Sequence, residues 1–212
     1  MGEAVTAVIL AGGESRRLGF DKTALRVGGK TLLQRTVELL WAWSEREVIV
    51  VTNSPQEHAQ SFARCVTDIY SGKGVLGGIY TGLTAAQTQR CLVVGADMPF
   101  LNPNVLTYLA SLAPDHDVVA PFAGENPEPL HAIYSRACLG PIESRLQADS
   151  VPRIISFYDA VRVRRVGAEE LQVYDPLLLS LFNINTPEDV QRARSILQAC
   201  GLDLDAPCPV DA

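Results

Sequence analysis

Short apolar runs alternate with amphipathic stretches along the first half of the chain. The apolar runs at residues 5–10, 47–52 and 91–95 have the length and composition of strands that are buried on both faces. The stretches between them repeat apolar residues with the spacing of helices, at residues 31–43, 56–63 and 76–86. Strands that alternate with helices predict a mostly parallel sheet covered by helices on both faces.

The second half of the chain continues this alternation. Asn102 and Pro103 predict the start of a helix that runs to about Ala113. Further helices are expected at residues 136–148, 151–157 and 186–200, and further strands at residues 117–121, 130–134, 160–166 and 181–185. We therefore predict a three-layer α/β domain over residues 1–200, followed by a loose tail over residues 201–212.

The composition argues against several classes of protein. The 212 residues are 47% hydrophobic, which is enough for one sizeable core. The net charge of −6 and the sequence pI of about 5.1 disfavour binding to nucleic acid or to a membrane surface, because both partners favour basic proteins. The five cysteines are odd in number and contain no C-x-x-C pair, which predicts a reduced, cytoplasmic protein without a zinc site.

The densest chemical signal directly follows the first predicted strand. Residues 10–22 read Leu-Ala-Gly-Gly-Glu-Ser-Arg-Arg-Leu-Gly-Phe-Asp-Lys. Glycines let the backbone approach a ligand closely, and successive N–H groups at a strand end can bind an anion. Arg16, Arg17 and Lys22 add positive charge beside these N–H groups, which is the combination that a triphosphate requires. The alternative is a surface loop with ordinary solvated charges.

Two other glycine patterns compete for the phosphate-binding role. Residues 24–31 resemble a Walker A loop, but Ala24 replaces its first glycine, so we expect a turn at Gly28 and Gly29 instead. Residues 72–77 match G-x-G-x-x-G, and Asp97 follows at about the distance of a ribose-binding acid, which leaves an NAD-binding dehydrogenase as an alternative. Against that alternative, the strand expected at residues 65–68 ends several residues before these glycines.

Asp97 comes directly after the buried run at residues 91–95. Pro99 cannot extend the strand's hydrogen-bond ladder, so the chain is expected to turn there. In a parallel sheet this carboxylate lies at the same edge as the glycine loop, where ligands bind. Magnesium usually takes one or two carboxylates together with substrate phosphates and water. Asp97 is thus a candidate metal ligand, and a turn-forming aspartate is the alternative.

The segment at residues 183–187 can be interpreted in two ways. Thr186, Pro187 and Asp189 form a good helix start. Asn183 and Asn185 would share one face of an extended strand, where two amides could bind a ligand. His131 lies in an expected strand of the same half, and both a structural role and contact with a substrate stay open.

Taken in order, these segments resemble the molybdenum cofactor guanylyltransferases. Residues 10–22 fit the family's opening motif at every fixed position. Residues 74–79 and 96–101 are similar to two further family segments, with Val75 in place of proline and Ala96 in place of cysteine. Residues 129–134 and 183–187 also fit. The resemblance implies a three-layer Rossmann-like nucleotidyltransferase fold with a mostly parallel central sheet.

The resemblance also implies a reaction and its participants. GMP moves from GTP to the phosphate of molybdopterin, and pyrophosphate is released. Magnesium is the implied cofactor, with manganese as a substitute. Molybdoenzymes or cofactor-delivery proteins are the implied protein partners. Residues 1–100 or so would bind the nucleotide and residues 101–200 or so the acceptor.

Individual roles follow from the same family match. The residues implied in nucleotide binding are Leu10, Ala11, Gly12, Gly13, Lys22, Asn53, Asp68 and Asp97. Those implied in catalysis are Arg17, Lys22 and Asp97, with Asp97 as the metal ligand and Gly19 as a further functional position. Those implied in acceptor binding are Arg153, Asn183 and Asn185. The rival functions are a transferase that uses CTP or another phosphorylated acceptor, and a non-catalytic nucleotide-binding module.

Overall fold

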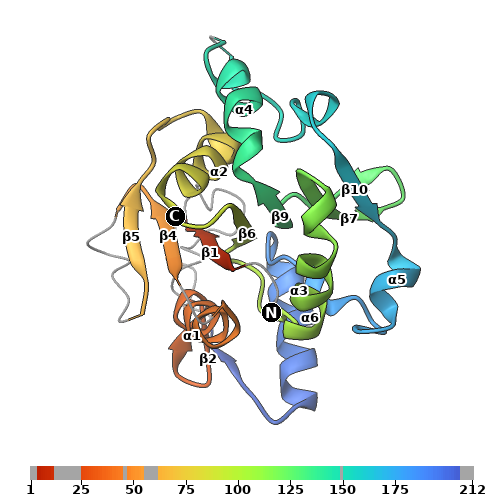
Figure 1. Ribbon diagram of the computed structural model, residues 1–212. Helices are drawn as coiled ribbons and strands as arrows, with labels where there is room; N and C mark the ends of the chain where they lie inside the picture. Colours follow the sequence, from red (N-terminus) through yellow and green to blue (C-terminus); the bar gives the residue numbers. More distant parts are fainter. Residues whose placement is uncertain (1–3, 12–24, 45–46, 55–61, 149, 206–212) are drawn as a thin grey trace.

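The central sheet of the computed structural model contains eight strands (Figure 1). The structure describes residues 4–11, 25–44, 47–54, 62–148 and 150–205. The strand order is β10-β7-β9-β6-β1-β4-β5, and β8 pairs with β7. The strands are β1 (Val5–Leu10), β4 (Val48–Thr52), β5 (Arg64–Thr67), β6 (Arg90–Gly95), β7 (Val118–Ala123), β8 (Asn126–Pro127), β9 (His131–Ser135) and β10 (Val163–Val166).

The pairing confirms a mostly parallel sheet. Strands β6, β1, β4 and β5 are parallel neighbours, and β10 is parallel to β7. Strand β9 runs antiparallel between β6 and β7, so it begins at the edge where they end. We call this edge, at which the parallel strands end, the carboxyl edge.

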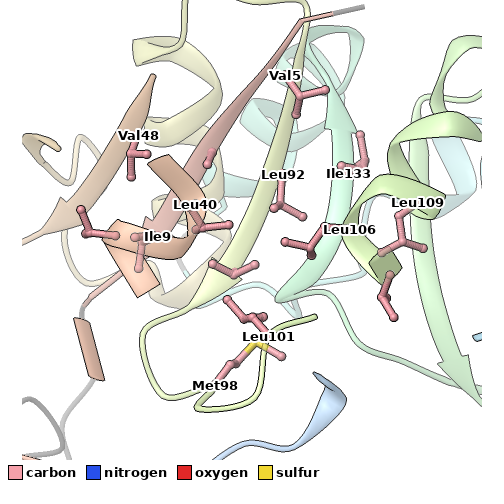
Figure 2. Close-up of a cluster of buried hydrophobic side chains, with 14 of the residues drawn as sticks. Val5, Ile9, Leu40, Val48, Leu92, Met98, Leu101, Leu106, Leu109 and Ile133 are labelled. Atoms are coloured by element: carbon pink, nitrogen blue, oxygen red, sulfur yellow. The ribbon is translucent and has the colours of Figure 1, made fainter. Parts of the chain in front are cut away.

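Helices cover both faces of the sheet, as predicted. In Figure 1, α2 (Gly74–Ala85) and α4 (Leu139–Leu146) lie on one side, and α1 (Leu32–Ser44) and α3 (Pro103–Ser111) on the other. Alternate residues of β1 explain the layering: Ile9 packs in the cluster that contains Leu40, whereas Val8 packs in the one that contains Leu83. Figure 2 shows the first cluster, in which the α1 and α3 side chains meet those of the sheet.

The remaining helices of the described residues lie in the second half of the chain. They are α5 (Ala168–Gln172), α6 (Pro187–Ala199) and the 3-10 helices Ala113–Asp115, Arg136–Cys138, Tyr158–Ala160 and Leu179–Leu181. Asn102 caps α3 as expected, because its side chain accepts a hydrogen bond from Asn104 N at 2.9 Å. No helix in the described part of the chain is long and apolar enough to cross a membrane.

A second, small sheet confirms one sequence expectation, the turn at Gly28 and Gly29, and corrects another, the loose tail. It joins β2 (Arg26–Val27), β3 (Lys30–Thr31) and β11 (Leu204–Asp205). Gly28 and Gly29 have φ values of 57° and 81°, which a two-residue hairpin requires, so this segment is a hairpin and not a Walker A loop. The tail was expected to be loose from residue 201 onward. Up to residue 205 it is ordered instead, because Leu204 is buried against Val27.

Two predicted elements of the second half are absent from the described structure. Residues 181–185 were expected to form a strand, but the chain leaves a 3-10 helix at Leu181 and pairs with no strand. Residues 151–157 were expected to be helical, but they form turns, such as the one closed by Ser156 N and Arg153 O at 3.0 Å. Pro152 disfavours a helical conformation of the residue before it. The helix expected at residues 56–63 falls mostly outside the described residues.

One close contact between α2 and β1 gives a stability prediction. A Cβ atom placed on Gly82 would lie 2.4 Å from Val8 Cγ1, which is fully buried in the sheet and cannot retreat. We expect Gly82→Ala to lower the free energy of unfolding by about 1–2 kcal/mol, because overpacking outweighs the gain of about 1 kcal/mol in helix propensity. Urea unfolding would measure the change. Gly140→Ala in α4 meets no atom within 4 Å and should not destabilise. Equal stabilities of the two variants would contradict the prediction.

Candidate active site

The carboxyl edge gathers the polar residues that follow four neighbouring parallel strands. The register pairs Leu10 of β1 with Val51 of β4 and with Gly95 of β6, so these strands end at one level. Strand β5 ends beside β4, with Thr67 opposite Thr52. Asp68, Asn53 and Ala11 directly follow β5, β4 and β1, and Asp97 follows β6 after one intervening residue, Ala96. The structure therefore brings to one edge the residues that sequence reasoning predicted there.

Two backbone hydrogen bonds attach the turn at Asp97 to its neighbours. Ala96 N donates to Leu10 O at 3.2 Å, which joins this turn to the start of the glycine loop. Ile184 N donates to Asp97 O at 3.0 Å, which joins it to the residues around the two asparagines. The end of β1, the acidic turn and the segment at residues 183–185 are thus held together. The loop itself, with Gly12, Gly13, Arg17, Gly19 and Lys22, lies outside the described residues.

The Asp97 side chain lies over the end of its own strand. A Cβ atom on Gly95 would be 2.5 Å from Asp97 Oδ1, so the carboxylate occupies space that glycine alone leaves open. Asp97 is partly exposed. Among the described residues, no group of three or more His, Cys, Asp or Glu side chains could hold a metal ion. A carboxylate at a strand end could hold a divalent metal ion together with phosphate oxygens and water.

Residues 183–185, which we call the asparagine segment, keep the predicted alternation without forming a strand. Ile184 is fully buried, whereas Asn183 is partly exposed and Asn185 is exposed. The Asn183 side chain donates to Leu181 O at 3.2 Å. Thr186 and Asp189 form the capping box of α6. Both asparagines therefore lie beside the turn at Asp97, and the predicted helix start is confirmed.

Asp68 is part of a hydrogen-bonded turn at the end of β5. Its Oδ1 accepts from Thr81 Oγ1 at 2.8 Å and from Tyr70 N at 3.1 Å. These bonds fix the carboxyl group at the start of the loop that leads to α2. Asn53, after β4, is exposed. Asn53 and Asp68 thus follow two neighbouring strands that end at the same level.

The geometry disfavours the dinucleotide alternative. Strand β5 ends at Thr67, Gly72 has a φ of 84° in the loop before α2, and Gly74, with a φ of 68°, is the first residue of that helix. Strands β4 and β1 separate β5 from β6, so Asp97 is not on the strand next to these glycines. A ribose-binding acid is expected on the neighbouring strand of that motif. The Gly72 pattern is therefore a loop that opens α2.

Arg153 is exposed and directly precedes the turns at residues 154–157. Val151 of the same segment approaches α2, because a Cβ atom on Gly74 would lie 3.3 Å from Val151 Cγ1. Lys73 Nζ also donates to Ala148 O. These contacts attach the segment that carries Arg153 to the N-terminus of α2.

Sequence reasoning missed Glu128. Its backbone N donates to Pro121 O at 2.9 Å, and burial raises the pKa of its carboxyl group. It lies near the carboxyl edge because β9 starts there, where Leu130 O accepts from Gly95 N at 3.3 Å. The sequence signal that could have identified Glu128 is its position just before β9, a strand that is antiparallel to both of its neighbours.

The fold and the polar residues at the carboxyl edge together define a nucleotidyltransferase, and the comparisons with known proteins agree. The family model described as MobA-like NTP transferase domain matches residues 7–163. The solved molybdopterin-guanine dinucleotide biosynthesis protein A from Archaeoglobus fulgidus superimposes with a TM-score of 0.80 at 28% identity, covering 92% of this chain and 100% of that one.

The curated relatives identify the branch. A probable molybdenum cofactor guanylyltransferase of Pelotomaculum thermopropionicum is 37% identical over 193 residues, which cover 89% of this chain and 91% of the relative. A molybdenum cofactor guanylyltransferase of Desulfosudis oleivorans is 36% identical over 199 residues, covering 93% of this chain and 98% of the relative. The chain belongs to the molybdenum cofactor guanylyltransferase family.

Proposed function

We propose that this protein transfers GMP from GTP to the terminal phosphate of molybdopterin and releases pyrophosphate. The supporting observation is the junction of three segments at the carboxyl edge. The end of β1 and the asparagine segment both bond to the turn at Asp97, at 3.2 and 3.0 Å. This arrangement allows a nucleotide over the first half of the sheet and an acceptor over the second half to meet at one carboxylate.

The nucleotide would lie along the ends of β1, β4 and β5. Leu10 and Ala11 lead into the loop whose Gly12 and Gly13 would expose their backbone to the phosphates. Lys22 and Arg17 would bring positive charge to the same place. The proposed contacts of the nucleotide on the next two strands are Asn53 and Asp68.

Asp97 would hold the metal ion, for which we propose magnesium, with manganese as a substitute. A bound divalent ion neutralises phosphate charge in such sites. The donor set fits, since a single carboxylate at a strand end leaves room for phosphate oxygens and water. Asn183 and Asn185 would contact the acceptor on the other side of Asp97, and Arg153 is a third proposed acceptor contact.

The chemistry needs no side-chain nucleophile. An oxygen of the acceptor phosphate forms a bond to the α-phosphorus of GTP while the bond to the pyrophosphate oxygen breaks. A phosphate monoester has a second pKa of about 6, so the attacking oxygen is already anionic near neutral pH. The barrier is the approach of two anions, and the protein lowers it by positioning and by neutralising charge.

Incubation with α-labelled GTP, magnesium and molybdopterin tests the proposal. We expect a labelled dinucleotide and an equal amount of pyrophosphate. The same assay with CTP and ATP tests base selectivity, and turnover with CTP alone would favour a related transferase. Binding of GTP without turnover in the presence of acceptor would instead indicate a non-catalytic module.

A further inference from the structure

A buried polar cluster lies beneath the acceptor side of the edge. His131 on β9 has no exposed surface, and Asp175 and Ser180 are 7% and 1% exposed. Asp175 Oδ2 accepts from Ser180 N at 2.7 Å. Burial lowers the pKa of His131 to about 4, although the backbone of Ser180 and the carboxylate of Asp175 act in the opposite direction. The imidazole is therefore neutral near pH 7. We call these three residues the His131 cluster.

The His131 cluster is costly for the stability of the protein. Within the described residues, neither ring nitrogen of His131 makes a hydrogen bond of good geometry, and the same holds for Ser180 Oγ. A buried polar atom without a partner costs about 1–3 kcal/mol. In the same loop, Leu178 has a φ of 53°, a conformation that non-glycine residues rarely adopt. Unpaired groups and backbone strain of this kind are typical of functional sites.

The backbone connects the His131 cluster to both sides of the proposed acceptor site. The residue before His131, Leu130, accepts a hydrogen bond from Gly95 N at 3.3 Å, two residues before Asp97. The loop at residues 175–181 continues directly into the asparagine segment, which bonds to Asp97 O through Ile184 N. A change in the packing between His131 and Ser180 would therefore move Asn183 and Asn185 relative to Asp97.

We propose that His131 is a positioning residue for the acceptor. Together with Asp175 and Ser180, it sets the loop at residues 175–181, and thereby the asparagine segment, relative to the turn at Asp97. His131 cannot contact a substrate itself, because it has no exposed surface. An apolar residue of similar volume would avoid this cost, so the stability of the fold gives no reason for an imidazole at this position. The identity of the acceptor rests on the proposed function.

Steady-state kinetics of three variants test this role. His131→Leu removes both nitrogens, His131→Gln keeps one donor and one acceptor, and His116→Gln is a matched control, with a ring that contacts Leu112 O at 3.0 Å near the opposite edge. We expect His131→Leu to lower kcat/KM for the acceptor about tenfold, with the KM for GTP within about twofold of wild type. His131→Gln should recover part of the loss, and His116→Gln should match wild type. Thermal unfolding of His131→Leu should be unchanged or shifted upward.

Two kinetic outcomes would overturn the proposal. In one, the constants for GTP and acceptor fall together while the melting temperature drops, which indicates a merely structural histidine. In the other, every constant stays at the wild-type value.

Amide hydrogen exchange separates this inference from the proposed function. In the protein without substrates, we expect faster exchange at residues 176–185 in His131→Leu than in wild type or His116→Gln. If wild type makes no dinucleotide, the proposed function fails, while faster exchange would still uphold the positioning of this segment. Unchanged exchange would overturn the positioning role whatever the activity.

Discussion

Replacing Asp97 by alanine should lower the rate of dinucleotide formation by about 10²–10³ without unfolding the protein. Losing one preorganised charge contact in a site of this kind often costs that much. The fold should survive because the bond from Ile184 N is accepted by the backbone oxygen of Asp97 and not by its carboxylate. The side chain is also partly exposed, so its removal leaves no large cavity.

Asp97→Asn separates charge from shape in the same experiment. Asparagine keeps the volume and one acceptor oxygen but loses the negative charge that a metal ion requires, so we expect a loss close to that of alanine. Asp115→Asn is the control, since Asp115 is exposed at the far edge of the sheet, where Pro114 O accepts from the side chain of Arg90 at the start of β6. Single-turnover rates at saturating GTP would measure the effect. Near-normal turnover of either Asp97 variant would refute the role of this carboxylate.

The sheet was predictable because its strands are buried on both faces. The apolar runs that predicted β1, β4 and β6 differ from the observed strands by one residue or less at either end. A strand that is buried on both faces carries apolar residues at successive positions. Such a run can be recognised in the sequence without knowing which strands lie beside it. The rule that ligands lie at the carboxyl edge then placed Asp97 at the same edge as the end of the first strand, and the register of β1 and β6 agrees.

The elements that were missed depend on distant contacts. Strand β11 is two residues long and forms only because Leu204 pairs with Val27, which lies near the other end of the sequence. The asparagine segment has the alternation of a strand, but its described backbone bonds to a turn and a helix start, and alternation cannot distinguish these partners. The His131 cluster combines one strand residue with two loop residues more than forty positions away. No local sequence pattern predicts that these three residues form a cluster.

Part of the site was predictable only by family resemblance. Nothing in the spacing around Asp68 or Arg153 marks either residue as a ligand, and the structure gives Asp68 a turn-forming role that ordinary aspartates also have. Glu128 was overlooked because an acid before a strand normally lies in solvent. Substitution and kinetics would test these assignments, and for Asp97 a further test leaves the carboxylate in place.

Gly95→Ala should lower turnover about 10²-fold although Gly95 is not among the proposed contacts of the nucleotide, the acceptor or the metal. The new Cβ would lie 2.5 Å from Asp97 Oδ1, closer than real Cβ contacts come, so the carboxylate must swing away. Its short side chain can rotate at little cost, so we expect the free energy of unfolding to change by less than about 1 kcal/mol. A displacement of about 1 Å at a reacting centre is enough for the loss of rate.

The same glycine-to-alanine change at Gly140 is the matched control, because a Cβ there has open space, and it should leave the rate of dinucleotide formation unchanged. Rates and urea unfolding of the two variants would be compared side by side. A parallel fall of rate and stability in Gly95→Ala would indicate damage to β6 instead of a displaced carboxylate. Wild-type turnover in Gly95→Ala, with turnover lost in Asp97→Ala, would show that the carboxylate acts from another rotamer than the one it adopts over Gly95.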